Sequence, residues 1–322
     1  MKKIYQAIIL LLGTVSCINE VEIKIDGDQS MIVVNASLRT DQKDHNIYLS
    51  TSTLQGIKKL EGATVTVKVN DSAPLTATFV PPAEEYYRYS TYTFTASLKA
   101  SDIVRIDVSH PDGYKAWCEV EFPGETPFRV SEQTEDNDYF YFKAPVTDRK
   151  GEENWYRISL DPEIIVNDSQ TITYDQYYGT FDTDEDPLLN QNLANSASNG
   201  SDDLFGDLFD VDTFSSFTDE TFRDSEYTVR IRSSKYYYSA PANETDTVEA
   251  WANIHLHTMT FLGYRYIMAL SSMELFGYES TILAEPTTIP VNVNGGIGFV
   301  SAETITTARV PVTAIKYDPT YY

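Results

Sequence analysis

The chain has 322 residues and carries 24 lysines and arginines against 48 aspartates and glutamates, a formal net charge of −24. This charge excludes nucleic-acid binding by charge attraction, and it opposes a peripheral hold on anionic lipid through basic patches. The length predicts about two domains. The 23 tyrosines, recurring with Thr, Val and Ile, indicate a protein built mainly of β-sheet.

The first residues read MKKIYQAIILLLGTVSC. Two lysines, a short apolar run and small residues are typical of a secretory signal, and the run is too short to span a bilayer, which needs about 20 apolar residues. The end, Thr-Val-Ser-Cys, resembles the lipobox of bacterial lipoproteins, in which the cysteine thiol takes a diacylglycerol. We therefore expect residues 1–16 to be removed and Cys17 to anchor the protein in a membrane. The alternative is an ordinary signal with an incidental cysteine.

Residues 17–30 are predicted to form an acidic tether, and residues 31–123 the first domain. In ATVTVKVN, residues 63–70, three valines alternate with polar residues, which is the pattern of a half-buried strand. About seven short strands separated by turn signals predict a β-sandwich of immunoglobulin-like architecture.

The last of these strands, YKAWCEVEF, places Trp117 and Cys118 on opposite faces. Cys118 is interpreted as a small buried hydrophobic residue. A disulfide with Cys17 and a nucleophilic role are the second and third interpretations.

The segment FPGETPF, residues 122–128, marks a domain boundary because it holds two prolines and a glycine. Residues 128–322 predict a second β-rich domain with one helix, from about Thr260 to Leu275. Within this domain, residues 182–224 hold twelve acidic residues and one basic residue. We expect this acidic insertion to be exposed and partly disordered.

Four segments share a pattern with a known family: FKAPVTDRKGEENWYRISL, FTDETFRDSEYTVRI, GYRYIMAL and EPTTIPVNVNGGIGFVSAET. In the last segment, residues 292–299 read Asn-x-x-Gly-Gly-x-Gly-Phe. Together with the lipobox and the early strand VVNASL, they resemble the DUF4249 family, a domain of unknown function found in outer-membrane lipoproteins of Bacteroidota. The resemblance implies an N-terminal β-sandwich, a second β-rich domain, a lipid anchor and service to a TonB-dependent nutrient receptor. It implies no catalytic residues, because none are assigned to the family.

Two groups of side chains resemble metal ligands. His255 and His257 are predicted to point to one face of a strand, as some zinc ligands do, but they equally fit a polar strand face without metal. Asp182, Asp184 and Asp186 occupy the first, third and fifth places of a calcium loop. Proline at the sixth place and leucine at the twelfth exclude an EF-hand, so we predict at most a looser Ca²⁺ site, with a solvated acidic loop as the alternative.

Among the tyrosine clusters, Tyr86, Tyr87 and Tyr89 lie beside a loop and are predicted to contact a glycan or peptide ligand. The alternative is cross-strand pairing. The glycines at 295–298 lack the Gly-Lys-Ser/Thr that completes a phosphate loop, and we interpret them as a tight turn. G-x-S-x-G and H-E-x-x-H are both absent from the sequence, and no catalytic residue is predicted.

These observations predict a lipid-anchored accessory or binding protein of the outer membrane, serving a TonB-dependent nutrient transporter. The acidic CINEVE after the cleavage site resembles export signals of surface lipoproteins, so we expect the protein on the cell surface. A structural or adhesive surface lipoprotein without a transporter is the alternative, and an enzyme with an unrecognised site is the third hypothesis.

Overall fold

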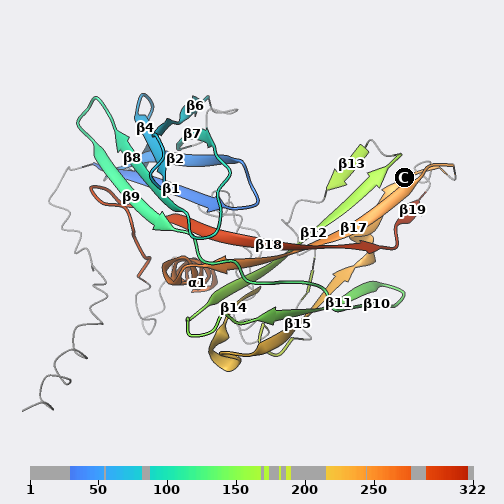
Figure 1. Ribbon diagram of the computed structural model, residues 1–322. Helices are drawn as coiled ribbons and strands as arrows, with labels where there is room; N and C mark the ends of the chain where they lie inside the picture. Colours follow the sequence, from blue (N-terminus) through green and yellow to red (C-terminus); the bar gives the residue numbers. More distant parts are fainter. Residues whose placement is uncertain are drawn as a thin grey trace, which may run out of the picture.

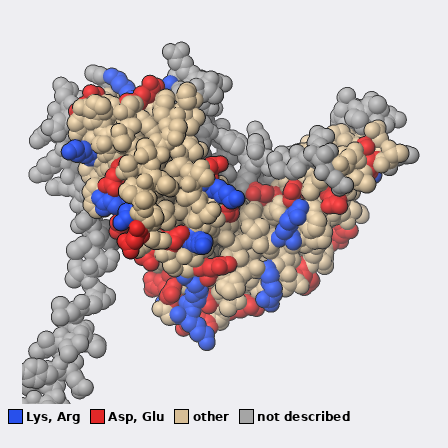
Figure 2. Space-filling model, turned by 45° about the horizontal axis from the view of Figure 1, so that its top comes forward, with Lys and Arg blue, Asp and Glu red and all other residues tan. Residues whose placement is uncertain are grey.

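The computed structural model describes residues 30–53, 56–81, 88–167, 170–173, 181–182, 186–189, 215–243, 245–276 and 288–317. These residues form nineteen strands, short 3₁₀ turns and one α-helix near the C-terminus. The prediction of a mainly β protein with one late helix is therefore confirmed. On the face shown in Figure 2, acidic and basic side chains are interspersed, so the negative charge is not gathered into a single patch there.

One ten-stranded sheet extends through the molecule, with β18 at its centre (Figure 1). Its main path, in spatial order, is β13 (Gln170–Thr173), β12 (Trp155–Val166), β17 (Val248–Met259), β18 (Val300–Val312), β1 (Met31–Arg39), β2 (Asp44–Thr53), β7 (Ser90–Thr95) and β6 (Thr78–Val80). Two strands lie off this path: β14 (Ser216–Thr218) pairs with β12, and β3 (Gly56–Lys59) pairs with β2. The pairing of β1 with β18 is parallel, and it joins the two ends of the chain.

Smaller sheets pack against this large sheet. One holds β5 (Leu75–Thr76), β4 (Thr64–Val69), β8 (Ile103–Ser109) and β9 (Lys115–Glu121). Another holds β10 (Glu132–Glu135), β11 (Tyr139–Thr147) and β15 (Glu226–Ser234), and a third pairs β16 (Ser239–Pro241) with β19 (Ile315–Tyr317). Figure 1 shows the four-stranded sheet above β18 and the three-stranded sheet below it. The result is two β-sandwiches that share one sheet.

Each sandwich has its own apolar core, and β18 contributes to both. Val300 and Ala302 pack in the first core with the valines of β4, as the alternation in that strand predicted. Val310 and Val312 pack against the second core. These four residues are even-numbered and so lie on the same face of the strand. The C-terminal segment, assigned by sequence to the second domain, therefore also completes the first sandwich.

The connection at residues 122–128 is held against the large sheet between the two cores. The Thr304 hydroxyl donates to the Pro123 carbonyl at 2.6 Å, and the Thr306 hydroxyl donates to the Thr126 carbonyl at 3.0 Å. The Thr258 hydroxyl donates to the hydroxyl of Thr126, which is fully buried, at 3.1 Å. Each such bond contributes about 0.5–1.5 kcal/mol, so this connection is a fixed strap and not a free linker.

The helix α1 (Phe261–Phe276) begins and ends within one residue of its predicted bounds. Thr260 caps it, because its hydroxyl accepts the backbone N–H of Gly263 at 3.0 Å. The Tyr266 ring stacks on Phe299 with centroids 4.3 Å apart. Phe299 immediately precedes β18, and it lies on the face of the sheet that carries the odd-numbered residues of this strand. The helix therefore covers the face of the large sheet opposite the two cores. In the described part of the chain, no helix is long and apolar enough to cross a membrane.

The end of the acidic insertion is buried, which corrects the expectation that residues 182–224 are exposed throughout. Phe217, in β14, and Phe222, which follows the 3₁₀ turn η5 (Asp219–Thr221), are 2 % and 5 % exposed. Both contact the Tyr156 ring, at centroid distances of 5.3 and 6.3 Å. Aromatic burial therefore outweighs the acidic composition at this end of the insertion.

A glycine turn at residues 292–298 joins β1 to β9 across the first sandwich. The Ile297 N–H donates to the Ile32 carbonyl at 2.9 Å, and Asn294 exchanges two backbone bonds with Trp117, at 2.8 and 3.0 Å. The Asn292 side chain closes the turn by bonding both backbone groups of Val300. This arrangement confirms the interpretation of the glycines as a turn with close backbone packing.

Alanine substitutions at Gly295 and Gly151 can be compared to measure the effect of this close packing, because the two glycines have the same backbone φ but different surroundings. Both have φ of +77°, but a Cβ on Gly295 would lie 2.5 Å from the Lys115 carbonyl oxygen, whereas a Cβ on Gly151 would meet nothing within 4 Å. We expect Gly151→Ala to lower the free energy of unfolding by about 1–2 kcal/mol through backbone strain. Gly295→Ala should cost roughly 1–3 kcal/mol more because it overpacks the turn. Urea unfolding measures both, and equal losses would contradict the close approach.

Candidate functional site

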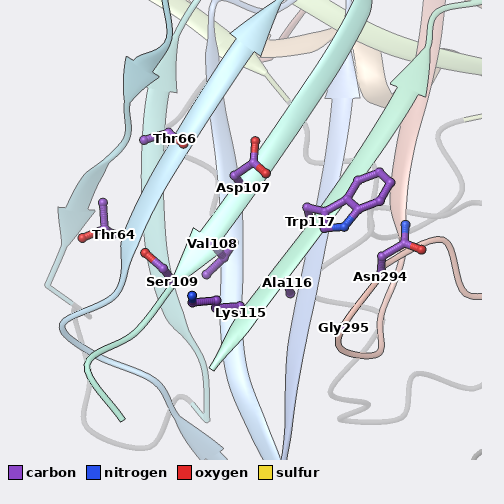
Figure 3. A pocket seen from close by; sticks show the side chains of 10 residues that line it. All are labelled: Thr64, Thr66, Asp107, Val108, Ser109, Lys115, Ala116, Trp117, Asn294 and Gly295. Atoms are coloured by element: carbon purple, nitrogen blue, oxygen red, sulfur yellow. The ribbon is translucent and has the colours of Figure 1, made fainter. Parts of the chain in front are cut away.

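The outer face of the four-stranded sheet carries an open groove of about 440 Å³ (Figure 3). This volume lies within the range of roughly 300–1,000 Å³ that small-molecule sites occupy. Strand register places its side chains in two rows across β4, β8 and β9. The first row is Thr64, Ser109 and Lys115, and the second is Thr66, Asp107 and Trp117.

The groove exists because short side chains on β4 and β8 lie beside long ones on β9. Thr64, Thr66 and Ser109 form a low floor, and Trp117 and Lys115 stand above it on β9. Alternation along the strands turns the neighbouring residues inward, where they pack in the first core. The core therefore holds the groove side chains on a rigid sheet.

The glycine turn forms one end of the groove. Figure 3 shows Asn294 and Gly295 beside the Trp117 indole. Asn294 reaches this position because its backbone N–H and carbonyl pair with those of Trp117. The motif at residues 292–298 thus positions a side chain in the groove as well as closing the sandwich.

Trp117 is the large exposed aromatic residue of the groove, with 40 % of its surface accessible. The Arg105 guanidinium lies 4.3 Å from its ring centre. Arg105 also donates two hydrogen bonds to Asp107, both at 2.9 Å. A cation over an exposed ring contributes about 0.5–1 kcal/mol, so Arg105 fixes the indole while the carboxylate fixes Arg105.

A second polar cluster lies on the odd-numbered face of the large sheet. His257 Nδ1 is 2.7 Å from a Glu303 carboxylate oxygen, and His257 Nε2 is 2.8 Å from the Ser159 hydroxyl. Arg157 donates to the same carboxylate at 3.2 Å. The order serine–histidine–carboxylate matches a nucleophile, a base and an orienting group.

Burial makes this cluster a structural network. Ser159 and His257 are each 1 % exposed and Glu303 is 5 % exposed, so a substrate carbonyl cannot reach the serine oxygen. Burial and the neighbouring Arg157 lower the pKa of His257 to about 3. Burial alone would raise the pKa of Glu303, but Arg157 and the His257 hydrogen bond hold it well below its usual range. The neutral His257 therefore donates a hydrogen bond from Nδ1 to the ionised Glu303 carboxylate. With Ser159 and Arg157, these side chains connect β12, β17 and β18.

His255 lies on the same face as His257, as predicted, and has its own partners. Its Nε2 is 3.0 Å from an Asp161 carboxylate oxygen, and its Nδ1 is 2.8 Å from the Thr307 hydroxyl. Among the described residues, no three His, Cys, Asp or Glu side chains are grouped so as to hold a metal ion. Both histidines instead form hydrogen bonds across the sheet, in agreement with the polar-face interpretation.

Of the three tyrosines predicted to bind a glycan or peptide, the structure describes Tyr89, which lies away from the groove. Tyr86 and Tyr87 are outside the described residues. The Tyr89 ring packs edge-on against Tyr48, with centroids 5.0 Å apart, beside the cluster of Tyr266 and Phe299. Tyr89 therefore borders the outer face of the large sheet, whereas the groove is on the other side of the first sandwich.

Two of the three predicted calcium ligands bind protein groups. Asp182 forms an ion pair with Arg232. The fully buried Asp186 carboxylate accepts the backbone N–H groups of Leu188, Leu189 and Arg230 and the Tyr227 hydroxyl. Asp184 is outside the described residues, so the Ca²⁺ site stays a prediction.

Cys118 is a free thiol in the first core and is 1 % exposed. Burial raises its pKa to about 12, so the thiol is protonated at neutral pH. A protonated, inaccessible thiol is a poor nucleophile. The interpretation of Cys118 as a small core residue is therefore supported by its place in the fold. Cys17 lies outside the described residues.

A family model described as a domain of unknown function, DUF4249, matches residues 18–309. The chain belongs to the DUF4249 family. The match includes the groove, the glycine turn and nearly all of both sandwiches; only the end of β18 and the last strand, β19, lie beyond the family region. A search of curated proteins returned no match.

Trp117 was not among the sequence-predicted binding residues of this DUF4249 protein, although a signal for it is present. In YKAWCEVEF, Trp117 alternates with Lys115 and Glu119 on the face opposite Cys118. A tryptophan on the polar face of a half-buried strand is exposed, and exposed aromatics mark binding surfaces. The cross-strand rows that complete the groove depend on register and are not visible in one strand.

The His257 network predicts a specific loss of stability in acid. Unfolded histidine titrates near pH 6.5, whereas buried His257 stays neutral to a much lower pH. Below about pH 6.5 the unfolded chain binds a proton that the folded chain does not, so stability falls as the pH falls, by at most ~1.4 kcal/mol per pH unit for this residue.

In His257→Gln this contribution is absent, because glutamine has no titratable group and can still donate to Glu303. We expect the wild type to lose more unfolding free energy than His257→Gln between about pH 7 and pH 5, where the Glu303 contribution is not yet lost. Urea unfolding at both pH values measures this, and other titrating groups cancel in the comparison. Parallel losses in the two proteins would contradict a neutral buried His257.

Proposed function

We propose that this protein is a lipid-anchored lipoprotein of the Bacteroidota outer membrane that binds a ligand for a TonB-dependent nutrient transporter. In this proposal it is exposed at the cell surface, is held by lipid on Cys17 and catalyses no reaction. The observation that carries the proposal is the Trp117 groove, an open, rigid surface that combines one exposed aromatic ring with polar side chains.

The chemistry of the two polar sites favours binding over catalysis. In the groove, Asp107 is ion-paired with Arg105, and the other polar groups are hydroxyls, an amide and the Lys115 ammonium. On the large sheet, the serine–histidine–carboxylate set is inaccessible. Accessible groups thus suit recognition, while the groups that resemble a catalytic set stabilise the sheet. A purely structural lipoprotein has no use for this groove, whereas an adhesive lipoprotein would use it to bind its target, so the pull-down below separates the two.

The lipid anchor predicts the number of free thiols. In the folded full-length protein, Cys118 should not react with a thiol reagent because it is buried and its pKa is raised. In denaturant, one thiol should react per chain if Cys17 carries lipid. The measurement is a quantitative thiol assay on protein expressed in a lipoprotein-processing host, with Cys118→Ala as the control that should show none.

Two other results would contradict the anchor. Two reactive thiols in denaturant would show that Cys17 is present and unmodified. No reactive thiol before reduction, but two after it, would show a Cys17–Cys118 disulfide.

The transporter partnership predicts co-purification. Tagged full-length protein, extracted from its native envelope in mild detergent, should recover a TonB-dependent receptor in near-equal amount, as measured by mass spectrometry. Cys17→Ala should lose most of this recovery, because the receptor and the protein then no longer share a membrane. Recovery of the wild-type lipoprotein alone, repeated after cross-linking, would overturn the partnership and favour the adhesive alternative.

A further inference from the structure

We propose that the Trp117 groove binds a neutral glycan, with the indole as the stacking platform and the two side-chain rows as hydrogen-bonding groups. This inference rests on the proposed function and names the class of its ligand. It assigns the glycan contact to this groove and not to Tyr86, Tyr87 and Tyr89.

The first argument is the combination of one aromatic ring with many short polar groups. A sugar ring has an apolar face of C–H groups and an edge of hydroxyls. Trp117 can pack against such a face, because 40 % of its surface is accessible. Around it, Thr64, Thr66 and Ser109 supply hydroxyls that both donate and accept hydrogen bonds. This mixture matches a carbohydrate.

The second argument is the supply of directed donors and acceptors in the two rows and beside Trp117. Lys115 provides a donor, and the Asn294 side chain provides both a donor and an acceptor. Each carboxylate oxygen of Asp107 accepts one bond from Arg105 and retains a further lone pair. A polyhydroxylated ligand can satisfy all of these groups at once.

The third argument is rigidity. Trp117 is held by backbone bonds on both sides, from β8 and from Asn294. Arg105 contacts its ring and is itself held by Asp107, with Glu119 at 3.9 Å. Binding therefore costs little side-chain ordering, which matters for a ligand that offers only weak individual contacts.

Charge argues for a neutral glycan. Beside the groove, the Arg105 charge is balanced by Asp107 and Glu119. The two rows themselves contain one cation, Lys115, and the whole chain carries −24. This excess repels anionic polymers.

The shape of the floor argues against a peptide. Peptide-recognition grooves use apolar pockets for side chains or an open sheet edge for backbone pairing. This floor is instead formed by threonines and a serine on the face of a sheet.

The test is a glycan array probed with full-length protein in detergent, bearing neutral glucans, xylans, mannans and galactans beside polyuronates and sulfated glycans. Affinity for the best neutral oligosaccharide is then measured by titration calorimetry. We expect Trp117→Ala to weaken binding at least about tenfold, in the range of losses seen for aromatic hot spots. Ser109→Val, which fills part of the floor and removes a hydroxyl, should also weaken binding.

Trp251→Ala is the matched control. Trp251 is also a strand tryptophan with an arginine, Arg309, over its ring at 4.0 Å, but it lies in β17 of the large sheet. The Trp251→Ala protein should bind the glycan with the affinity of the wild type. Circular dichroism and urea unfolding on each variant show whether a loss of binding reflects a loss of fold.

The outcomes separate this inference from the proposed function. If neutral glycans bind and Trp117→Ala weakens binding at least about tenfold while Trp251→Ala does not, the inference holds, whatever the pull-down shows. If only anionic glycans or peptides bind, or if Trp117→Ala binds like the wild type, the inference is overturned. If no glycan binds but a receptor co-purifies equally with wild type and Trp117→Ala, the transporter role stands and the glycan site falls.

Discussion

The pairing of β18 with both β1 and β17 is the constraint on which the structure depends. This strand of 13 residues runs parallel to β1 at its start and antiparallel to β17 along most of its length. Parallel pairing of β1 with β18 joins chain ends more than 250 residues apart, which costs loop-closure entropy before any contact forms. The stabilisation gained is large, because one strand then packs its even-numbered apolar side chains against two separate cores.

The opposite face of this shared strand explains the buried polar network. Both cores pack on one face of the sheet, so the odd-numbered residues of β18, on the opposite face, need other partners. Near the start of β18 they are covered, and Glu303 is satisfied by Arg157 and His257 instead of by water. A buried charge without a partner would be strongly destabilising. The serine–histidine–carboxylate geometry is thus explained by the need to satisfy a covered sheet face, without a catalytic role.

Local features of this fold were visible in the sequence, and long-range features were not. The valines of β4, the opposite faces of Trp117 and Cys118, and the helix bounds follow from period-2 and period-3.6 patterns that involve neighbouring residues only. The position of β18 between β1 and β17 has no local signal, because its polar residues read as an exposed strand. The buried aromatics at the end of the acidic insertion were hidden by the composition around them.

The candidate site shows the same division. The exposed tryptophan follows from one strand, but the groove needs the register of β4, β8 and β9 and the arrival of Asn294 from the far end of the chain. The strap at residues 122–128 was interpreted as a domain boundary because proline and glycine mark turns. It is indeed irregular, yet Thr258, Thr304 and Thr306 bind it to the sheet.

A continuous sheet and a bound strap together determine how this protein can recognise a ligand. Proteins that close two domains around a ligand need a hinge of a few residues that absorb the rotation. Here rotation of one sandwich against the other would break the ladder of β18 and the hydrogen bonds of the strap. Recognition therefore has to occur on a preformed surface that changes little on binding. The outer face of the four-stranded sheet meets this requirement, because its side chains are set by strand register and its end wall by a glycine turn that leaves no room for a Cβ.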